Sequence, residues 1–244
     1  MRPRGLILAA ALAALLLTST GLAQAELIKE VAIGARWKAF QLTGDKDFVG
    51  TITGGAVDER TEWHPTNFNM LFVLCPYGGV SVEYDRFGAT MEKDGRLFWN
   101  TFTLGLNLRR HFKQWNLAPY GVVGVTYNSP DFEENNWWRY GWDSNAAYDA
   151  RVAAKPDNVD PIQWMSSGRV RDMKTDPALG FTFGVGLDFF VWKNMAINAD
   201  MRWNLASTDV SYTVVDNNGD TLLRRDFSYD LDTIAYSLGL RWYF

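Results

Sequence analysis

The sequence predicts an all-β fold, an eight-stranded antiparallel up-and-down transmembrane β-barrel. Three observations lead to this prediction. Eight segments alternate apolar and polar side chains with the two-residue period of a β-strand. Short and long connections alternate strictly between those segments. Aromatic residues make up 15% of the chain, and they gather near the segment ends, where strands of a membrane barrel leave the lipid.

The first 25 residues are expected to be a secretory signal peptide rather than part of the fold. Arg2 and Arg4 form a basic start, residues 5–17 are apolar, and Ala23-Gln24-Ala25 fits the small-x-small cleavage pattern. An N-terminal membrane anchor is the alternative, but the apolar run is short for a bilayer span. Residues 26–244 are then expected to form one barrel domain.

Six of the eight strands show a clear apolar row, and the strand that begins at Phe68 shows a less regular one. The remaining strand, at 117–128, carries Val122, Val123 and Val125, which leave its facing ambiguous. The rows, in chain order, are Val31, Ile33, Ala35, Trp37; Phe68, Met70, Phe72, Leu74; Val80, Val82, Tyr84; Phe102, Leu104, Leu106, Leu108; Phe181, Phe183, Val185, Leu187, Phe189; Ile197, Ala199, Met201, Trp203, Leu205; and Ile234, Tyr236, Leu238, Leu240, Trp242, Phe244.

The connections divide into two classes. Short turns are expected near 75–79, 113–116 and 191–194. Long loops are expected at 44–65, at 88–96, at 129–177, and around 216–220, where Asn218-Gly219 is a hairpin-turn signal. Short turns at one end and long loops at the other are typical of outer-membrane barrels.

Alternation alone does not decide between a soluble barrel and a membrane barrel, in which the apolar row faces outward. The polar rows are rich in Gly and in charges of both signs, which suits a narrow lumen better than a hydrated exterior. A soluble barrel with an apolar ligand inside is the alternative, and it predicts solubility without detergent. Aromatic residues are expected at two interfaces: Tyr77, Trp115, Trp192, Trp242 and Phe244 at the short-turn end, and Trp37, Tyr84, Trp99 and Trp203 nearer the long loops.

Composition excludes several classes of function. The chain has 24 Lys and Arg against 28 Asp and Glu, a net charge of −4, which argues against nucleic-acid binding. Cys75 is the single cysteine, so no internal disulfide is expected. Beyond the signal peptide, no apolar run reaches the length of a transmembrane helix.

The last strand ends on an aromatic residue. Its outward row, Tyr236, Leu238, Leu240, Trp242 and Phe244, resembles the C-terminal assembly signal of Gram-negative outer-membrane proteins. The rest of the mature chain resembles, in pattern, the small eight-stranded barrels of the OmpA-transmembrane, OmpX and OmpW type. This resemblance implies an outer-membrane location, contact with lipid and lipopolysaccharide, recognition by the barrel assembly machinery, short periplasmic turns and long extracellular loops.

Nine charged residues are expected to face the lumen. An eight-stranded interior is just wide enough for side chains to fill, so charges there must be paired. A structural ion-pair network that plugs the lumen is the first interpretation, and a gated polar path or small ligand site is the second. The nine residues are Arg36, Lys38, Glu83, Asp85, Arg109, Asp188, Asp200, Arg202 and Arg241.

The loop at 129–177 carries an aromatic cluster, Trp137, Trp138, Tyr140 and Trp142. We expect these rings either to fold the loop over the barrel mouth or anchor it in headgroups, or to recognise a ligand or partner. A loop of this length is often functional.

Catalysis, metal and cofactor find little support in the sequence. A hydrolase needs a nucleophile, a base and an orienting group, and the chain has two histidines, His64 and His111. The segment 216–220 resembles a calcium loop faintly, but it lacks the following Glu, so a hairpin tip is expected. No cofactor is predicted.

The sequence therefore indicates a non-enzymatic outer-membrane barrel with a structural or surface-interaction role, or a route for small hydrophobic solutes. A lipid-modifying enzyme, acting on lipid A or phospholipid, is the alternative.

Overall fold

The computed structural model describes residues 28–43, 57–59, 67–91, 95–142, 145–157, 164, 168–216 and 218–244. The expected signal peptide, His64 and the side chain of Trp137 lie outside the described part. The elements in chain order are β1 (Glu30–Leu42), β2 (Val57–Glu59), β3 (Asn67–Cys75), β4 (Gly78–Met91), β5 (Gly95–Arg109), η1 (Lys113–Trp115), β6 (Leu117–Glu134), α3 (Asn136–Arg139), α4 (Asn145–Ala153), β7 (Arg169–Thr175), β8 (Ala178–Trp192), β9 (Met195–Asp216), β10 (Thr221–Asp230) and β11 (Thr233–Tyr243).

Eight of these strands close into an antiparallel ring, which confirms the predicted fold class. The order around the ring is β1-β3-β4-β5-β6-β8-β9-β11, and β11 pairs with both β9 and β1. Phe244 is still paired, since its N–H donates to the carbonyl of Val31 at 2.8 Å. A closed ring satisfies the backbone groups without water, as lipid requires.

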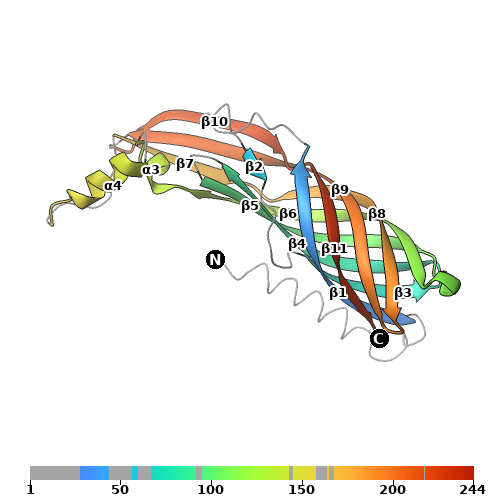
Figure 1. Cartoon of the computed structure of the whole chain (residues 1–244). Helices are drawn as coiled ribbons and strands as arrows, with labels where there is room; N and C mark the ends of the chain where they lie inside the picture. The colour runs from blue at the N-terminus through green and yellow to red at the C-terminus, as the bar shows by residue number, and fades with distance from the viewer. Residues whose placement is uncertain are drawn as a thin grey trace, which may run out of the picture.

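The molecule continues beyond the ring as an outer extension, built from the upper ends of the ring strands together with β2, β7 and β10. Figure 1 shows this extension bending away from the barrel, with α3 and α4 near its far end. The upper half of β9 pairs with β10 on one side and with β7 on the other. Upper β4 and β5 pair with each other, and β5 pairs with upper β6.

The extension corrects the predicted loops. The segment 129–177, expected as a single loop, contains the outer end of β6, helices α3 and α4, and strand β7. The connection expected around 216–220 is the tip of a long β9–β10 hairpin, in which the Asp216 side chain accepts hydrogen bonds from the N–H groups of Asn218 and Asp220. The alternation in these strands was not recognised because their outward rows are polar.

The polarity of the inward and outward rows inverts along the strands, and β9 shows this most fully. In its lower half the outward row includes Met201 and Leu205, and the inward row includes Asp200 and Arg202. In its upper half the buried inward row becomes Val210, Tyr212 and Val214. The change on both faces near Ala206 indicates where the strand passes from lipid to water, because lipid requires an apolar exterior and water does not.

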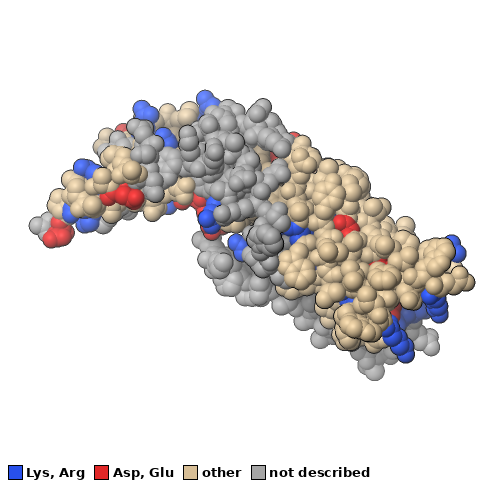
Figure 2. All heavy atoms as spheres, in the orientation of Figure 1, with Lys and Arg blue, Asp and Glu red and all other residues tan. Residues whose placement is uncertain are grey.

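The lipid-facing surface of the ring is apolar. Leu106, Leu108, Val125, Phe181 and Leu238 are each at least half exposed. Figure 2 shows a mostly uncharged barrel surface, with Lys and Arg gathered at the short-turn end.

The aromatic residues expected at the two interfaces face outward, with one exception. Tyr77, Trp115, Trp192, Trp242 and Phe244 are exposed at the short-turn end. Trp99 was expected at the opposite interface, but it is 1% exposed and points inward. It lies above the level where the strands change polarity, so its inward row belongs to the interior of the extension.

Among the described residues, two buried apolar clusters occur, one at each end of the charged lumen. A small cluster at the short-turn end contains Ala32, Leu71, Val73, Ala196 and Tyr243, with Phe190 against it. A large cluster fills the extension and is described below. Among the described residues, no helix is both long enough and apolar enough to cross a bilayer.

Candidate functional site

The centre of the lumen is an ion-pair cluster around Arg36. Its guanidinium pairs with Glu83 of β4 and with Asp200 of β9. Arg202 contacts the same two carboxylates, at 2.9 Å from Glu83 and 3.0 Å from Asp200. Strands β4 and β9 are four steps apart in the ring of eight, so the Glu83–Arg202 pair joins opposite walls. Such pairing offsets the cost of burying these charges.

The remaining charges lie above and below this cluster. Above it, Lys38 pairs with Asp85. Below it, Asp188 accepts from Arg241 at 2.8 Å, and Arg109 lies 4.0 Å away. All nine predicted residues are buried, and the structure places all nine on the lumen side.

Uncharged polar residues join the three groups of charges into one network. These residues were not among those predicted from the sequence. Asn67 accepts from Arg36 at 2.7 Å and donates to Asp85 at 2.7 Å. Asn198 donates to Asp188 at 2.7 Å and to the Tyr120 hydroxyl at 2.9 Å, which donates to Asp200 at 3.1 Å. For Asn67 and Asn198 the alternation was the available signal, because each lies opposite the apolar row of its strand, whereas the facing of the strand that carries Tyr120 was ambiguous.

The network crosses the lumen from wall to wall, so its chemistry is that of a plug. Solute passage along the barrel axis would require several buried ion pairs to separate, and an unpaired buried charge is costly. This geometry favours the first sequence interpretation, a structural network, over the second, a gated polar path or small ligand site.

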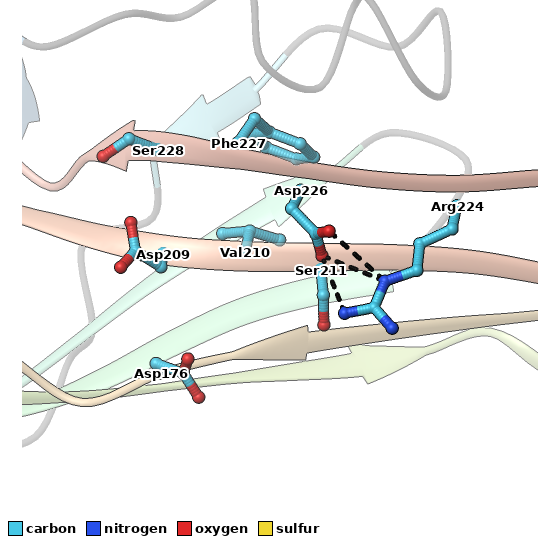
Figure 3. Close-up of a pocket in the computed structure, with 8 residues that line it drawn as sticks. All are labelled: Asp176, Asp209, Val210, Ser211, Arg224, Asp226, Phe227 and Ser228. Carbon is cyan, nitrogen blue, oxygen red and sulfur yellow. Dashed lines mark hydrogen bonds and ion pairs between the residues drawn. The ribbon is translucent and has the colours of Figure 1, made fainter.

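The outer face of the β9–β10 hairpin carries a groove of about 450 Å³ (Figure 3). Asp209, Asp226 and Asp176 line it, together with Arg224, which lies 3.2 Å from Asp226. Both members of this pair are largely exposed, so the pair contributes little to stability. Val210 and Phe227 line the groove as well, and it therefore borders the interior of the extension.

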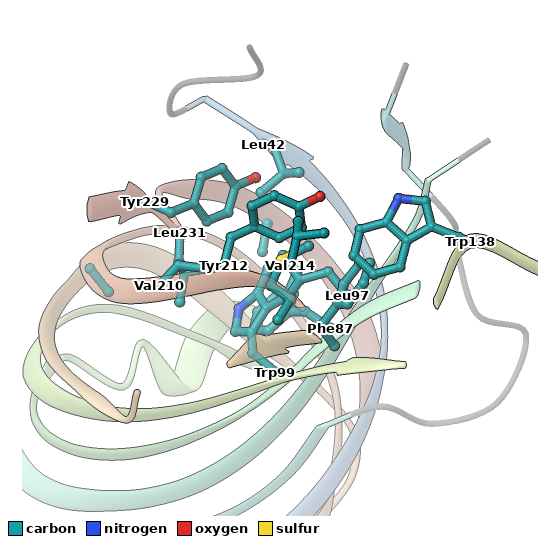
Figure 4. Close-up of a cluster of buried hydrophobic side chains, with 14 residues drawn as sticks. Leu42, Phe87, Leu97, Trp99, Trp138, Val210, Tyr212, Val214, Tyr229 and Leu231 are labelled. Atoms are coloured by element: carbon teal, nitrogen blue, oxygen red, sulfur yellow. The ribbon is translucent and has the colours of Figure 1, made fainter. Parts of the chain in front are cut away.

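Behind this groove, the interior of the extension is filled by a large apolar cluster, which we call the outer cluster (Figure 4). Phe87 and Trp99 stack with ring centres 5.2 Å apart, and Phe40 meets both rings edge-on. Its members are Leu42, Phe87, Leu97, Trp99, Phe132, Trp138, Met173, Ala206, Val210, Tyr212, Val214, Tyr229, Leu231 and Ala235. The inward rows that carry charge in the barrel thus carry apolar side chains above it.

The predicted aromatic cluster of the third loop is divided between two surroundings. Trp138 is 2% exposed and belongs to the outer cluster, with its ring 5.8 Å from Phe132 and 6.0 Å from Tyr212. Tyr140 stacks on Tyr148 of α4 at 6.1 Å. Trp142 is half-buried. The four residues were predicted as one unit, because sequence proximity does not show that this segment turns through a helix.

Glu134 closes the join between β6 and β7. Its carboxylate accepts a 2.8 Å hydrogen bond from the N–H of Met173 and lies 3.7 Å from the guanidinium of Arg139. Burial raises the pKa of Glu134 above its ordinary value of 4.5, against the opposing effect of that hydrogen bond.

The two histidines of the sequence lie in different situations: His64 is outside the described residues, and His111 lies near the short-turn end. His111 stacks on Phe190 with ring centres 4.7 Å apart, and burial lowers the pKa of its imidazole. No group of three or more His, Cys, Asp or Glu able to hold a metal ion occurs among the described residues.

Comparison with known structures supports the fold. OprG of Pseudomonas aeruginosa aligns with a TM-score of 0.56 at 13% identity, over 89% of this chain and 97% of that one. AlkL aligns at 0.49 with 17% identity over 92% and 94%, and Escherichia coli outer membrane protein W at 0.44 with 13% identity over 88% and 97%. No curated protein matches this chain in sequence.

The family model described as the outer membrane protein beta-barrel domain matches residues 9–244. This match covers nearly the whole sequence and agrees with the closed ring and its inverted surface. The chain belongs to the outer-membrane β-barrel family and is located in the outer membrane.

Proposed function

We propose that this barrel is a non-enzymatic receptor that passes small hydrophobic compounds from the medium into the membrane. One observation carries the proposal: an apolar interior, the outer cluster, lies on the extracellular side of a lumen filled with buried ion pairs. The interior of the extension suits an apolar solute, because transfer of apolar surface out of water is favourable.

The route for such a solute is sideways. Below the outer cluster the inward rows become charged, at Lys38 and Asp85 on the level next to Phe40 and Phe87. An apolar compound gains nothing by entering this network and would separate its ion pairs. The lipid surrounding the strands offers it an apolar environment at the same level, so release into the bilayer is favoured over passage along the axis.

The entrance is the groove on the β9–β10 hairpin. Val210 and Phe227 line the groove, Val210 is a member of the outer cluster, and Phe227 packs against it. Phe227 is only half-buried, so it lies between groove and cluster. Motion of this one ring would open a path between them.

Uptake of the apolar dye N-phenylnaphthylamine by cells that express the protein tests the proposal. Trp138→Ala and Phe227→Ala should lower uptake, and Tyr140→Ala is the matched control outside the outer cluster. Lumen variant Glu83→Gln should leave dye uptake unchanged. Uptake that follows Glu83 and ignores Trp138 would overturn the sideways route.

A surface-interaction role is the second candidate. The far end of the extension projects with α3 and α4 (Figure 1), and Leu222 at the start of β10 is 54% exposed. Leu222→Ser should then weaken attachment of expressing cells to a host surface without changing dye uptake. The enzyme alternative is tested by His64→Ala, which should abolish any lipase or acyltransferase activity if His64 is its base.

A further inference from the structure

Gly121 lies in the middle of a regular part of β6, where the backbone does not require a glycine. Glycine within a strand marks a bulge, a tight bend, or a close approach of backbone or ligand. The register through Gly121 is regular, against Leu108 on β5 and Val185 on β8. Its φ is not positive. A Cβ placed there would have its nearest neighbour, the Gly184 carbonyl oxygen, at 3.8 Å, which is ordinary contact. The space that the missing side chain leaves is therefore available to a ligand.

Gly121 faces outward and forms the floor of an apolar groove in the lipid-facing wall. The groove measures about 250 Å³, and Leu108, Val123, Phe183, Val185 and Trp203 rise around it. Phe183 and Trp203 stack with ring centres 5.3 Å apart and form its upper wall. The missing side chain of Gly121 therefore opens a hollow in a surface that is otherwise covered by large apolar residues.

A second hollow of about 580 Å³ continues the groove toward the periplasmic end. It shares Leu108, Gly121 and Val185 with the first and adds Arg110 and Pro119. The N–H of Arg110 donates to the Pro119 carbonyl at 3.1 Å, which places this pair one step below Leu108 and Gly121. From Arg110 to the level of Leu106 the wall spans ~14 Å, at about 3.4 Å per residue.

Arg110 gives the groove a charged end. Its guanidinium is exposed, with the central carbon 5.1 Å from the centre of the Phe112 ring. Within the described chain no carboxylate forms an ion pair with it. Lys29, Lys113 and Lys193 are exposed at the same end, where Figure 2 shows Lys and Arg gathered. An apolar groove that leads to an unpaired guanidinium at the membrane interface is complementary to an amphiphile with an anionic head.

We propose that the Gly121 groove binds one acidic phospholipid of the periplasmic leaflet. One acyl chain lies over Gly121 between Leu108 and Val185, and the phosphate accepts hydrogen bonds from Arg110. Guanidinium and phosphate form strong charge-assisted hydrogen bonds. The aromatic stack of Phe183 and Trp203 limits how far the chain extends along the wall.

Native mass spectrometry tests this site. The protein is purified from bilayers that contain equal amounts of phosphatidylglycerol and phosphatidylcholine. The wild type should retain one phosphatidylglycerol in preference to phosphatidylcholine. Gly121→Leu fills the groove and should abolish this preference. Arg110→Gln should lower retention about tenfold, which corresponds to loss of one charge-assisted hydrogen bond.

Two variants serve as matched controls. Ala35→Leu enlarges a small lipid-facing residue on β1, which lies opposite β6 in the ring, and Lys193→Gln removes a neighbouring charge outside the groove. Both should retain phosphatidylglycerol as the wild type does. Resistance to SDS before heating verifies that each variant is folded. If Gly121→Leu does not fold, Gly121→Ala replaces it as the milder substitution.

Three results would overturn the assignment. Equal retention of both lipids in every variant would mean ordinary annular lipid. Loss in Gly121→Leu without loss in Arg110→Gln would mean an uncharged apolar occupant. Equal displacement by inorganic phosphate alone, with no effect of Gly121→Leu, would mean an anion site without a chain.

Discussion

Strand β9 runs through both regions of the molecule, and its two halves bury opposite kinds of side chain. The lower half buries Asp200 and Arg202 and exposes Leu205, while the upper half buries Val210 and Tyr212. Strand β5 repeats this arrangement, with Arg109 and Asn107 inside the barrel and Leu97 and Trp99 inside the extension. Backbone geometry is the same in both halves, so the surrounding solvent decides which row is polar.

The two interiors are also stabilised differently. In the lumen, charges and amides satisfy one another across the ring, and removal of one partner leaves another charge buried. In the extension, the outer cluster buries aromatic area, as in a soluble domain. The following predictions test this contrast, beginning with the largest effect.

Arg36→Met should cost about 3–5 kcal/mol of unfolding free energy, because it removes one of the two guanidinium groups that Glu83 and Asp200 share and leaves two buried carboxylates on Arg202 alone. Urea unfolding in detergent, followed by SDS-gel mobility, measures this loss. The matched control is Arg224→Met, which breaks an exposed pair in the extension and should cost less than about 0.5 kcal/mol. Equal costs would mean that the lumen network does not stabilise the barrel.

Trp99→Ala should destabilise the extension by about 3 kcal/mol through the cavity it leaves against Phe87 and Phe40. Hydrogen exchange should accelerate in β7 and β10 and remain slow in the ring strands. Trp115→Ala, at an exposed position, is the control and should change neither. Faster exchange throughout the ring would contradict separate stabilisation of the two regions.

Met201→Lys and Ser211→Lys place the same charge on the outward row of β9, ten residues apart. In lipid the lysine at 201 should cost about 2 kcal/mol, and at 211, in water, it should cost close to nothing. Unfolding in lipid vesicles measures both. A similar cost at the two sites would place position 211 in the bilayer and move the boundary near Ala206.

The smallest expected effect is a pH dependence confined to the extension. Because the folded pKa of Glu134 is raised, the folded state binds more protons than the unfolded state over the range above 4.5. Stability of the β6–β7 join should therefore be greatest at low pH and should fall as pH rises through that range. Exchange at the Met173 amide reports this, and Glu134→Gln should remove the pH dependence. An unchanged profile in Glu134→Gln would assign it to another group.

Much of the barrel could be predicted from local pattern. Alternation identified all eight ring strands, and the parity of Arg36, Glu83 and Arg202 identified them as inward-facing. The partners could not be predicted in the same way. Glu83 and Arg202 are 119 residues apart, and their contact depends on the stagger of the strands when the ring closes.

The sequence analysis did not predict the extension because its strands have polar residues outside and apolar residues inside, the opposite of the barrel pattern. In the segment after Leu205 the outward row is Ser207, Asp209, Ser211 and Thr213, so no apolar outward row extended the predicted strand beyond Leu205. Trp99 was assigned to the membrane interface because the sequence does not show how far along its strand the lipid ends. Trp138 was assigned to a loop cluster because the chain turns through α3 before it packs inward.

The sequence by itself determined the eight ring strands, since a two-residue period is a property of each strand and needs no partner. The small and charged residues of the polar rows then indicated that the barrel is inverted. The sequence also determined that the charged side chains face the lumen and that aromatic residues lie near the strand ends. Only the tertiary structure decided where the inversion stops, which charges meet across the lumen, and that Gly121 lies in a groove between Leu108 and Val185. These features depend on closure and register, which bring together residues from strands that the chain visits far apart.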